Sequence, residues 1–193
     1  IEIIRTWITQ GASFGTFTVA VVEPEKPAGD VASADSGVKM APHTESASEA
    51  FAILDQLAKD LPPVPDDQLA MARDMGALAL PLNQQSPLIT VNFQQGGKDV
   101  TDDRVAQLAP MANNITWLNL AGTGVTDAGL ANLESMSKLT RLHLERTGIT
   151  DAGLAHVAKL PHLEYLNLFG TPVTDAGLAQ LEGLTELKKL YVW

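Results

Sequence analysis

The 193-residue chain contains no cysteine. Disulfide bonds, thiolate metal sites and covalently attached c-type haem are therefore excluded within these residues. Long hydrophobic runs are also missing, since none approaches the roughly 18–20 residues that a membrane-spanning helix needs. No signal peptide is visible. The sequence thus predicts neither a direct membrane span nor a metal or cofactor site in this chain.

Positive charge is scarce. The chain has 13 Lys and Arg residues and 23 Asp and Glu residues, which gives a formal net charge of −10. An acidic chain without a basic stripe argues against binding to nucleic acid or to an anionic membrane surface, whereas a basic protein partner remains compatible. Hydrophobic residues make up 45 % of the chain, so the sequence predicts a folded protein.

One segment is repeated along the second half of the chain at a fixed period. Copies of 24 residues begin at positions 115, 139 and 163, and a partial copy begins at position 187. The full copies read ITWLNLAGTGVTDAGLANLESMSK, LTRLHLERTGITDAGLAHVAKLPH and LEYLNLFGTPVTDAGLAQLEGLTE. A degenerate copy of 27 residues begins at position 88. This self-similarity predicts a solenoid with an atypical first repeat.

Each repeat reads as a short strand followed by a short helix. The L-x-x-L-x-L pattern buries alternate side chains, as a strand does, and a following threonine is expected to satisfy the turning backbone. In TDAGL, the threonine caps the helix and the aspartate lies in its first turn, so the helix explains the carboxylate without calcium. Gly129, Gly153 and Gly177 are expected to let adjacent coils approach closely.

The first 87 residues do not share this repeat. Residues 44–60 and 66–75 read as helices, and residues 77–82 read as a strand that leads into the solenoid. These pieces would cover the open N-terminal end of the repeats. Residues 23–42 are rich in Pro, Ala, Gly and Ser and read as a linker. Because the chain begins with Ile1, we expect it to be part of a longer protein.

The TDAGL-type unit resembles the bacterial leucine-rich repeats common in planctomycetes and related phyla, and it is similar to the cysteine-free relatives of F-box-protein repeats. The resemblance covers about half of the chain, residues 88–193. It implies an α/β solenoid with a parallel β-sheet on the concave face and short helices on the convex face. Residues 43–87 would form the helical N-terminal cap.

In this architecture, strand residues that do not enter the core point outward from the concave sheet. The repeat spacing predicts three columns: Thr90, Trp117, Arg141, Tyr165 and Lys189; Asn92, Asn119, His143, Asn167 and Tyr191; and Gln94, Ala121, Glu145, Phe169 and Trp193. Aromatic and arginine side chains dominate binding hot spots. The predicted partner-binding residues are Trp117, Asn119, Arg141, His143, Glu145, Tyr165, Asn167, Phe169, Tyr191 and Trp193.

A second resemblance concerns the start of the chain. IRTWITQGASF, residues 4–14, looks like the last helix of the planctomycete-type c-type cytochrome domain, which tends to end in a W-I-x-x-G-A string. Residues 1–22 would then end a preceding cytochrome-like domain. The family's haem-attachment motif Cys-x-x-Cys-His is absent here, so the resemblance implies that haem c lies upstream of Ile1 and that this chain holds no cofactor.

Catalysis is weighed on His143, which lies between Arg141 and Glu145 in the predicted columns. It could act as an acid–base group. No serine or cysteine stands beside it in the columns, and no second carboxylate accompanies Glu145 there. The sequence therefore predicts that the protein is not an enzyme.

These observations favour a non-catalytic protein-interaction module. The cytochrome resemblance implies an extracytoplasmic or periplasmic tail, tethered to a membrane by an upstream segment, that docks subunits of a respiratory or photosynthetic electron-transfer complex. One alternative is a structural solenoid whose concave face is filled by its own chain. Another is a substrate-receptor domain of the F-box or effector type, which would need an F-box-like helical segment upstream.

Overall fold

The computed structural model of the chain describes residues 47–192. The predictions for residues 1–22 and 23–42, and the placement of Trp193, lie outside the described residues. The strands are β1 (Leu78–Pro81), β2 (Ile89–Asn92), β3 (Ile115–Asn119), β4 (Arg141–His143), β5 (Tyr165–Asn167) and β6 (Lys189–Tyr191). The α-helices are α2 (Ala47–Ala58), α3 (Asp66–Asp74), α4 (Asp102–Ala106), α5 (Asp127–Leu130), α6 (Asp151–Val157) and α7 (Asp175–Ala179). The 3₁₀ helices are η1 (Gln94–Asp99), η2 (Ala109–Asn114), η3 (Ala131–Ser135) and η4 (Gln180–Gly183).

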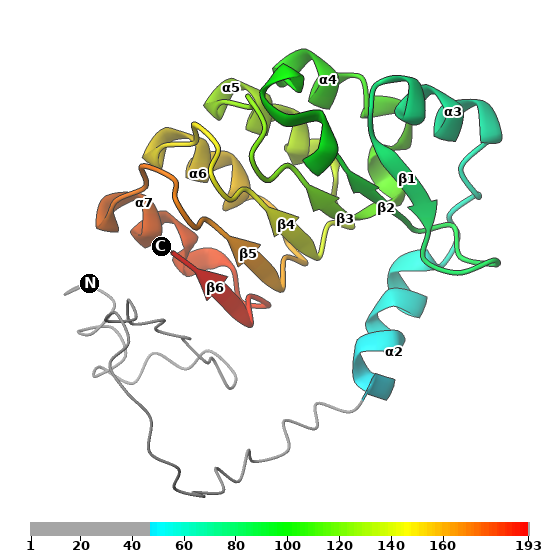
Figure 1. Cartoon of the computed structure of the whole chain (residues 1–193). Helices are drawn as coiled ribbons and strands as arrows, with labels where there is room; N and C mark the ends of the chain where they lie inside the picture. Colours follow the sequence, from blue (N-terminus) through cyan, green and yellow to red (C-terminus); the bar gives the residue numbers. More distant parts are fainter. Residues whose placement is uncertain (1–46, 193) are drawn as a thin grey trace, which may run out of the picture.

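The strands form one curved sheet with helices stacked along one side of it (Figure 1). Strand order follows chain order from β1 to β6, and β2 to β6 run parallel. Leu118 pairs in register with Leu142, which pairs with Leu166. Since each crossover passes through α4, α5, α6 or α7, these helices lie side by side in the same order as the strands.

The sheet is parallel from β2 to β6, as predicted for the repeats, and β1, the strand that leads into them, pairs antiparallel with β2. Leu78 is in register with Asn92, and Leu80 is in register with Thr90. Residues 82–88 form a short connection, and the Leu82 N–H at its start donates to the Leu88 carbonyl at its end, at 3.0 Å. A parallel crossover needs about a dozen residues or more, so this connection is long enough only for an antiparallel return.

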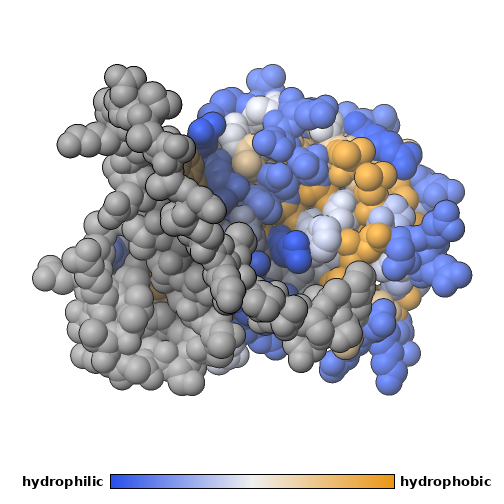
Figure 2. Space-filling view, turned by 60° about the horizontal axis from the view of Figure 1, so that its bottom comes forward, coloured by the Kyte–Doolittle hydropathy of each residue, from blue (hydrophilic) through white to orange (hydrophobic). Residues whose placement is uncertain are grey.

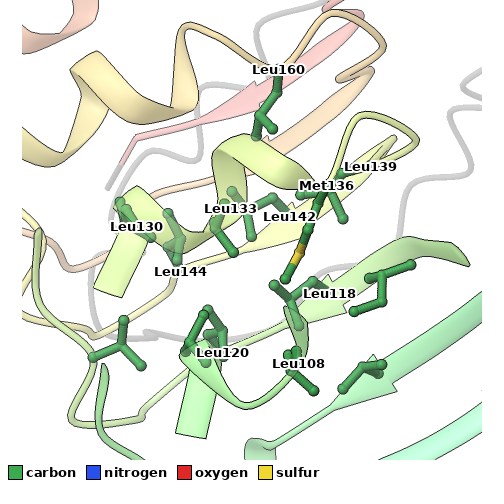
Figure 3. Close-up of a cluster of buried hydrophobic side chains, with 14 of the residues drawn as sticks. Leu108, Leu118, Leu120, Leu130, Leu133, Met136, Leu139, Leu142, Leu144 and Leu160 are labelled. Atoms are coloured by element: carbon green, nitrogen blue, oxygen red, sulfur yellow. The ribbon is translucent and has the colours of Figure 1, made fainter. Parts of the chain in front are cut away.

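The core is a continuous layer of aliphatic side chains between the sheet and the helices (Figure 3). In the coil drawn there, Leu118 and Leu120 from the strand side meet Leu130 and Leu133 from the helix side, and all four are fully buried. The threonine after each strand satisfies the turning backbone as predicted: the hydroxyls of Thr123, Thr147 and Thr171 donate to carbonyls three residues earlier, at 2.6–2.7 Å.

On the helix side, the TDAGL aspartates link one coil to the next. The Asp127 carboxylate accepts the Thr150 N–H at 2.8 Å and the Thr150 hydroxyl at 2.6 Å. The same pair of bonds joins Asp102 to Thr126 and Asp151 to Thr174. The explanation of these aspartates by the helix alone was therefore incomplete, because their oxygens bind the threonine of the following coil. We call this row of contacts the Asp–Thr ladder.

The TDAGL glycines are required by the same ladder. A Cβ on Gly153 would collide with the Asp127 carboxylate and with the Ile149 side chain. Gly129 and Gly177 stand in the same relation to Asp102 and Asp151. The prediction that these glycines let adjacent coils approach closely is confirmed.

The described part of the N-terminal third packs onto the first coil. Leu69 and Ala72 of α3, together with Met75, belong to the common hydrophobic core. The buried Asn114 side chain donates to the carbonyls of Pro62 and Pro87, each at 2.9 Å. These contacts fix the α2–α3 connection and the β1–β2 connection to the end of the first repeat.

Candidate functional site

The parallel register aligns the predicted columns of the concave face. Trp117, Arg141, Tyr165 and Lys189 are successive register partners on β3 to β6. The second column follows from Asn119 through His143 and Asn167 to Tyr191. Each of these residues is only partly buried or exposed, while the residues between them enter the core. The spacing in the sequence thus placed these side chains on one face.

The asparagines of the second column form hydrogen bonds with the backbone, a role that the sequence analysis did not predict. The Oδ1 atoms of Asn92, Asn119 and Asn167 each accept the backbone N–H of the residue two positions later, at 2.8–3.0 Å. These bonds close the turn that ends each strand. The hydrogen bond to the backbone therefore accounts for asparagine at this position. Because Oδ1 is used in that bond, the side-chain NH₂ group is the part left for other contacts.

On β4, His143 occupies the column position that asparagine holds on β2, β3 and β5, and it belongs to a polar network. Its Nδ1 lies 2.8 Å from Glu145 Oε1, which also accepts from Asn167 Nδ2 at 2.6 Å. The Tyr165 ring packs against His143 and Tyr191, with ring centroids 4.8 and 5.3 Å apart. Burial raises the pKa of the Tyr165 phenol, so this hydroxyl stays protonated at neutral pH.

The His143–Glu145 pair resembles an oriented base. Within the described residues, the Asn167 amide is hydrogen-bonded to this pair and the Tyr165 ring is stacked on it, and neither of these two groups is a nucleophile at neutral pH. A nucleophile within hydrogen-bond reach of the base is the geometric requirement for covalent catalysis. Among the described residues, the arrangement is suited to fixing the orientation of side chains on the sheet.

Two arginines lie over aromatic rings at this face. The Arg141 guanidinium is 4.4 Å from the centroid of the Trp117 ring, and the Arg146 guanidinium is 5.8 Å from the Phe169 ring. Both distances fall within the range of cation–π attraction. Phe169 nevertheless remains 44 % exposed. Stacking holds the arginines in place while leaving their N–H donors accessible.

Sequence analysis missed two members of this face, Leu78 and Leu80. Both lie on β1 and are 54 % and 44 % exposed, which is unusual for leucine in this molecule. Their register partners, Asn92 and Thr90, belong to the columns, so the antiparallel strand extends the face at its N-terminal end. The alternating segment ALALPL carried the signal, but its pairing direction depended on the turn that follows.

The N-terminal part of the face is hollowed. A depression of about 210 Å³ is lined by residues of β2, β3 and β4: Thr90, Val91, Asn92, Trp117, Leu118, Asn119, Arg141 and His143. On the part of the surface that the space-filling view leaves uncovered, hydrophobic side chains lie together with hydrophilic residues around them (Figure 2). The exposed Leu78 and Leu80 of β1 lie beside this depression, next to β2 in the sheet.

A second hollow, of about 480 Å³, lies between α2 and the turns that precede β4, β5 and β6. Ile53 and Leu57 contribute from the helix, and Leu187 contributes from the last turn. Among its lining residues, Lys188 forms an ion pair with Glu164 at 3.0 Å, and His162 Nδ1 lies 3.0 Å from Glu186 Oε2.

Neither a metal cluster nor a membrane span is found in the part of the chain that the structure describes. No group of three or more His, Asp or Glu side chains there is placed to hold a metal ion. No helix within residues 47–192 is both long and apolar enough to cross a bilayer.

Comparison with known proteins agrees with the coil geometry. The family described as "Leucine Rich repeat" matches residues 135–158 and 159–181. The match and the stacked strand–helix coils support a leucine-rich-repeat protein with an open, mostly parallel sheet. Leucine-rich-repeat domains generally mediate protein–protein interaction and are typically not enzymes. A search of curated proteins found no match.

Among solved structures, the chain is similar to an internalin, InlF, from Listeria monocytogenes. The two share 19 % identity over 44 % of this chain, with a TM-score of 0.33. The similarity spans 30 % of the internalin chain.

Proposed function

We propose that this protein is a non-catalytic interaction module that binds a protein partner on the concave sheet face. The observation that carries the proposal is the set of partly exposed aromatic side chains and the exposed Arg141 held in register on a parallel sheet. Interfaces concentrate their binding energy in such residues, particularly where packing fixes them in advance. Trp117 with Arg141, and Tyr165 between His143 and Tyr191, are fixed in this way.

In this proposal, residues 43–87 serve as the N-terminal cap of a solenoid with a 24-residue period. The support is the burial of α3 against the first coil and the two bonds from Asn114. A cap is needed because the terminal coil of a solenoid would otherwise expose its core. The leucines of β1 then belong to the cap and to the binding face at once.

We further propose that the module is the extracytoplasmic tail of a membrane-anchored, c-type-cytochrome-like protein, with subunits of an electron-transfer complex as partners. The support is the resemblance of residues 4–14, which lie outside the described residues. Purification of the native protein in mild detergent tests this placement. A c-type haem absorption spectrum in stoichiometric amount is expected, and a colourless preparation would contradict it while leaving the concave-face proposal intact.

The concave-face proposal is tested with Tyr165→Ala. The ring lies on the outer side of the sheet, so we expect nearly unchanged thermal stability and a loss of more than about 1 kcal/mol in partner affinity, as for a hot-spot residue. Isothermal titration with the partner from the native complex measures the loss. Glu182→Ala, an exposed position on η4, is the matched control. Equal affinity of both variants would remove the concave face as the binding surface.

A further inference from the structure

We infer that the partner presents an extended acidic segment that crosses the strands of the concave face, with an apolar residue seated at the β1–β3 end. This inference rests on the proposed function and adds the chemistry and direction of the ligand. It follows from the distribution of charge, from the state of the cations and from the change in polarity along the face.

The charge of the concave face is opposite to that of the whole chain. The described columns contain Arg141 and Lys189 but a single acid, Glu145, and Arg146 lies at their rim against Phe169. The complete chain carries a net charge of −10. A locally positive face on an acidic protein attracts an acidic ligand and repels other copies of the protein's own acidic surface.

The cations of the face are available, whereas its acid is occupied. Arg141, Arg146 and Lys189 are exposed, and none forms an ion pair with a carboxylate within residues 47–192. Glu145 Oε1 is taken by His143 and Asn167. Arginine fixed on an aromatic ring keeps a planar fork of donors, which suits a carboxylate. Binding an acid there therefore requires no internal ion pair to be broken.

The polarity of the face gives the ligand a direction. The exposed Leu78 and Leu80 of β1 form the apolar end. Arg141 and Lys189 lie on β4 and β6, two strand spacings apart, which is about 10 Å. An extended chain advances about 3.3 Å per residue. Two carboxylates about three residues apart therefore match the two cations when the chain crosses the strands, with the apolar residue lying farther toward β1.

The single acid of the face does not stand directly against such a ligand. The Oε2 atom of Glu145 is buried within the described residues, so a segment lying on the sheet does not reach it. The Oε1 atom lies beside His143 and Asn167.

The test uses the full chain and three synthetic peptides of equal length. The first carries one leucine and two aspartates about three residues apart, the second has lysines for the aspartates, and the third has asparagines. Fluorescence anisotropy is expected to show binding of the acidic peptide that weakens with added salt. Arg141→Glu and Lys189→Glu should each weaken it at least about tenfold, whereas Arg73→Glu, an exposed position on α3, should not.

The outcomes separate this inference from the proposed function. If the lysine or asparagine peptide binds as well as the acidic one and Tyr165→Ala weakens it, the acidic ligand is wrong and the concave face stands. If the acidic peptide binds but Arg73→Glu weakens it as much as Arg141→Glu, attraction is non-specific and the inference falls. A photo-crosslinker replacing Leu80 that reacts with residues 1–46 of the same chain, and not with the peptide, would show that the chain fills its own face and would overturn both.

Discussion

The helix side and the concave side of this solenoid use the same repeat in different ways. On the helix side, identical residues make identical contacts in each coil: an aspartate binds the next threonine, and a glycine leaves room for it. On the concave side, the register is equally regular, yet the side chains differ from strand to strand. The repeated residues therefore make the contacts between coils, whereas the side chains that vary lie on the partly exposed face for which we propose binding.

Removing a core side chain should have the largest effect on the repeated part. Leu142 of β4 is fully buried between its register partners Leu118 and Leu166. Leu142→Ala is expected to lower the free energy of unfolding by about 2–5 kcal/mol, from lost burial and the cavity left behind. Urea denaturation followed by circular dichroism measures the loss. Leu78→Ala, at an exposed leucine of β1, should change stability by less than about 0.5 kcal/mol.

A smaller loss is expected from closing the space of the Asp–Thr ladder. Gly153→Ala places a methyl group against the Asp127 carboxylate and Ile149, and should cost about 1–3 kcal/mol through overpacking. Gly183→Ala is the matched control, since a Cβ there meets nothing within 4 Å. If both glycine variants unfold at the same denaturant concentration, the ladder does not need the glycine.

The ladder also predicts a dependence on pH. The Thr174 hydroxyl and N–H hold the pKa of Asp151 below its usual value of 3.8. Because the folded-state pKa is the lower one, the stabilisation is present above about pH 3.8 and is lost as the pH falls through the folded-state pKa. Thermal melts at decreasing pH should show less acid destabilisation for Asp151→Asn than for the unchanged chain. Identical acid profiles would contradict a role for this carboxylate in joining coils.

The smallest effect on stability should come from the concave face. Trp117→Ala removes a partly exposed ring that lies under the Arg141 guanidinium, so the free energy of unfolding should change by no more than about 1 kcal/mol. The same denaturation experiment measures it. A loss as large as that of Leu142→Ala would show that the face is part of the structural core and would remove the contrast between the two sides.

The repeated part of the fold was predictable because each strand and helix follows from a short local pattern, and the same pattern recurs in successive repeats. The 24-residue spacing alone predicts Arg141 beside Trp117 and Asn167 beside His143, and the register of the strands confirms both. The role of the column asparagines was missed, since an Asn that faces outward and one that closes its own turn have the same spacing. The partner-binding role of these residues stays a prediction.

The sequence by itself determined the coil, the alternation between core and surface, and the residues of each column, because a period of fixed length leaves one way to stack strands. Tertiary structure alone decided that β1 returns antiparallel and brings Leu78 and Leu80 to the concave face. It also decided that Asp127 and Asp151 of the TDAGL segments bind the following coil and do not only serve their own helix. The direction of β1 and the bonds between coils both depend on contacts between different segments of the chain. The sequence of one segment does not identify the segment that it will contact, because that choice is made by the packing of the folded chain.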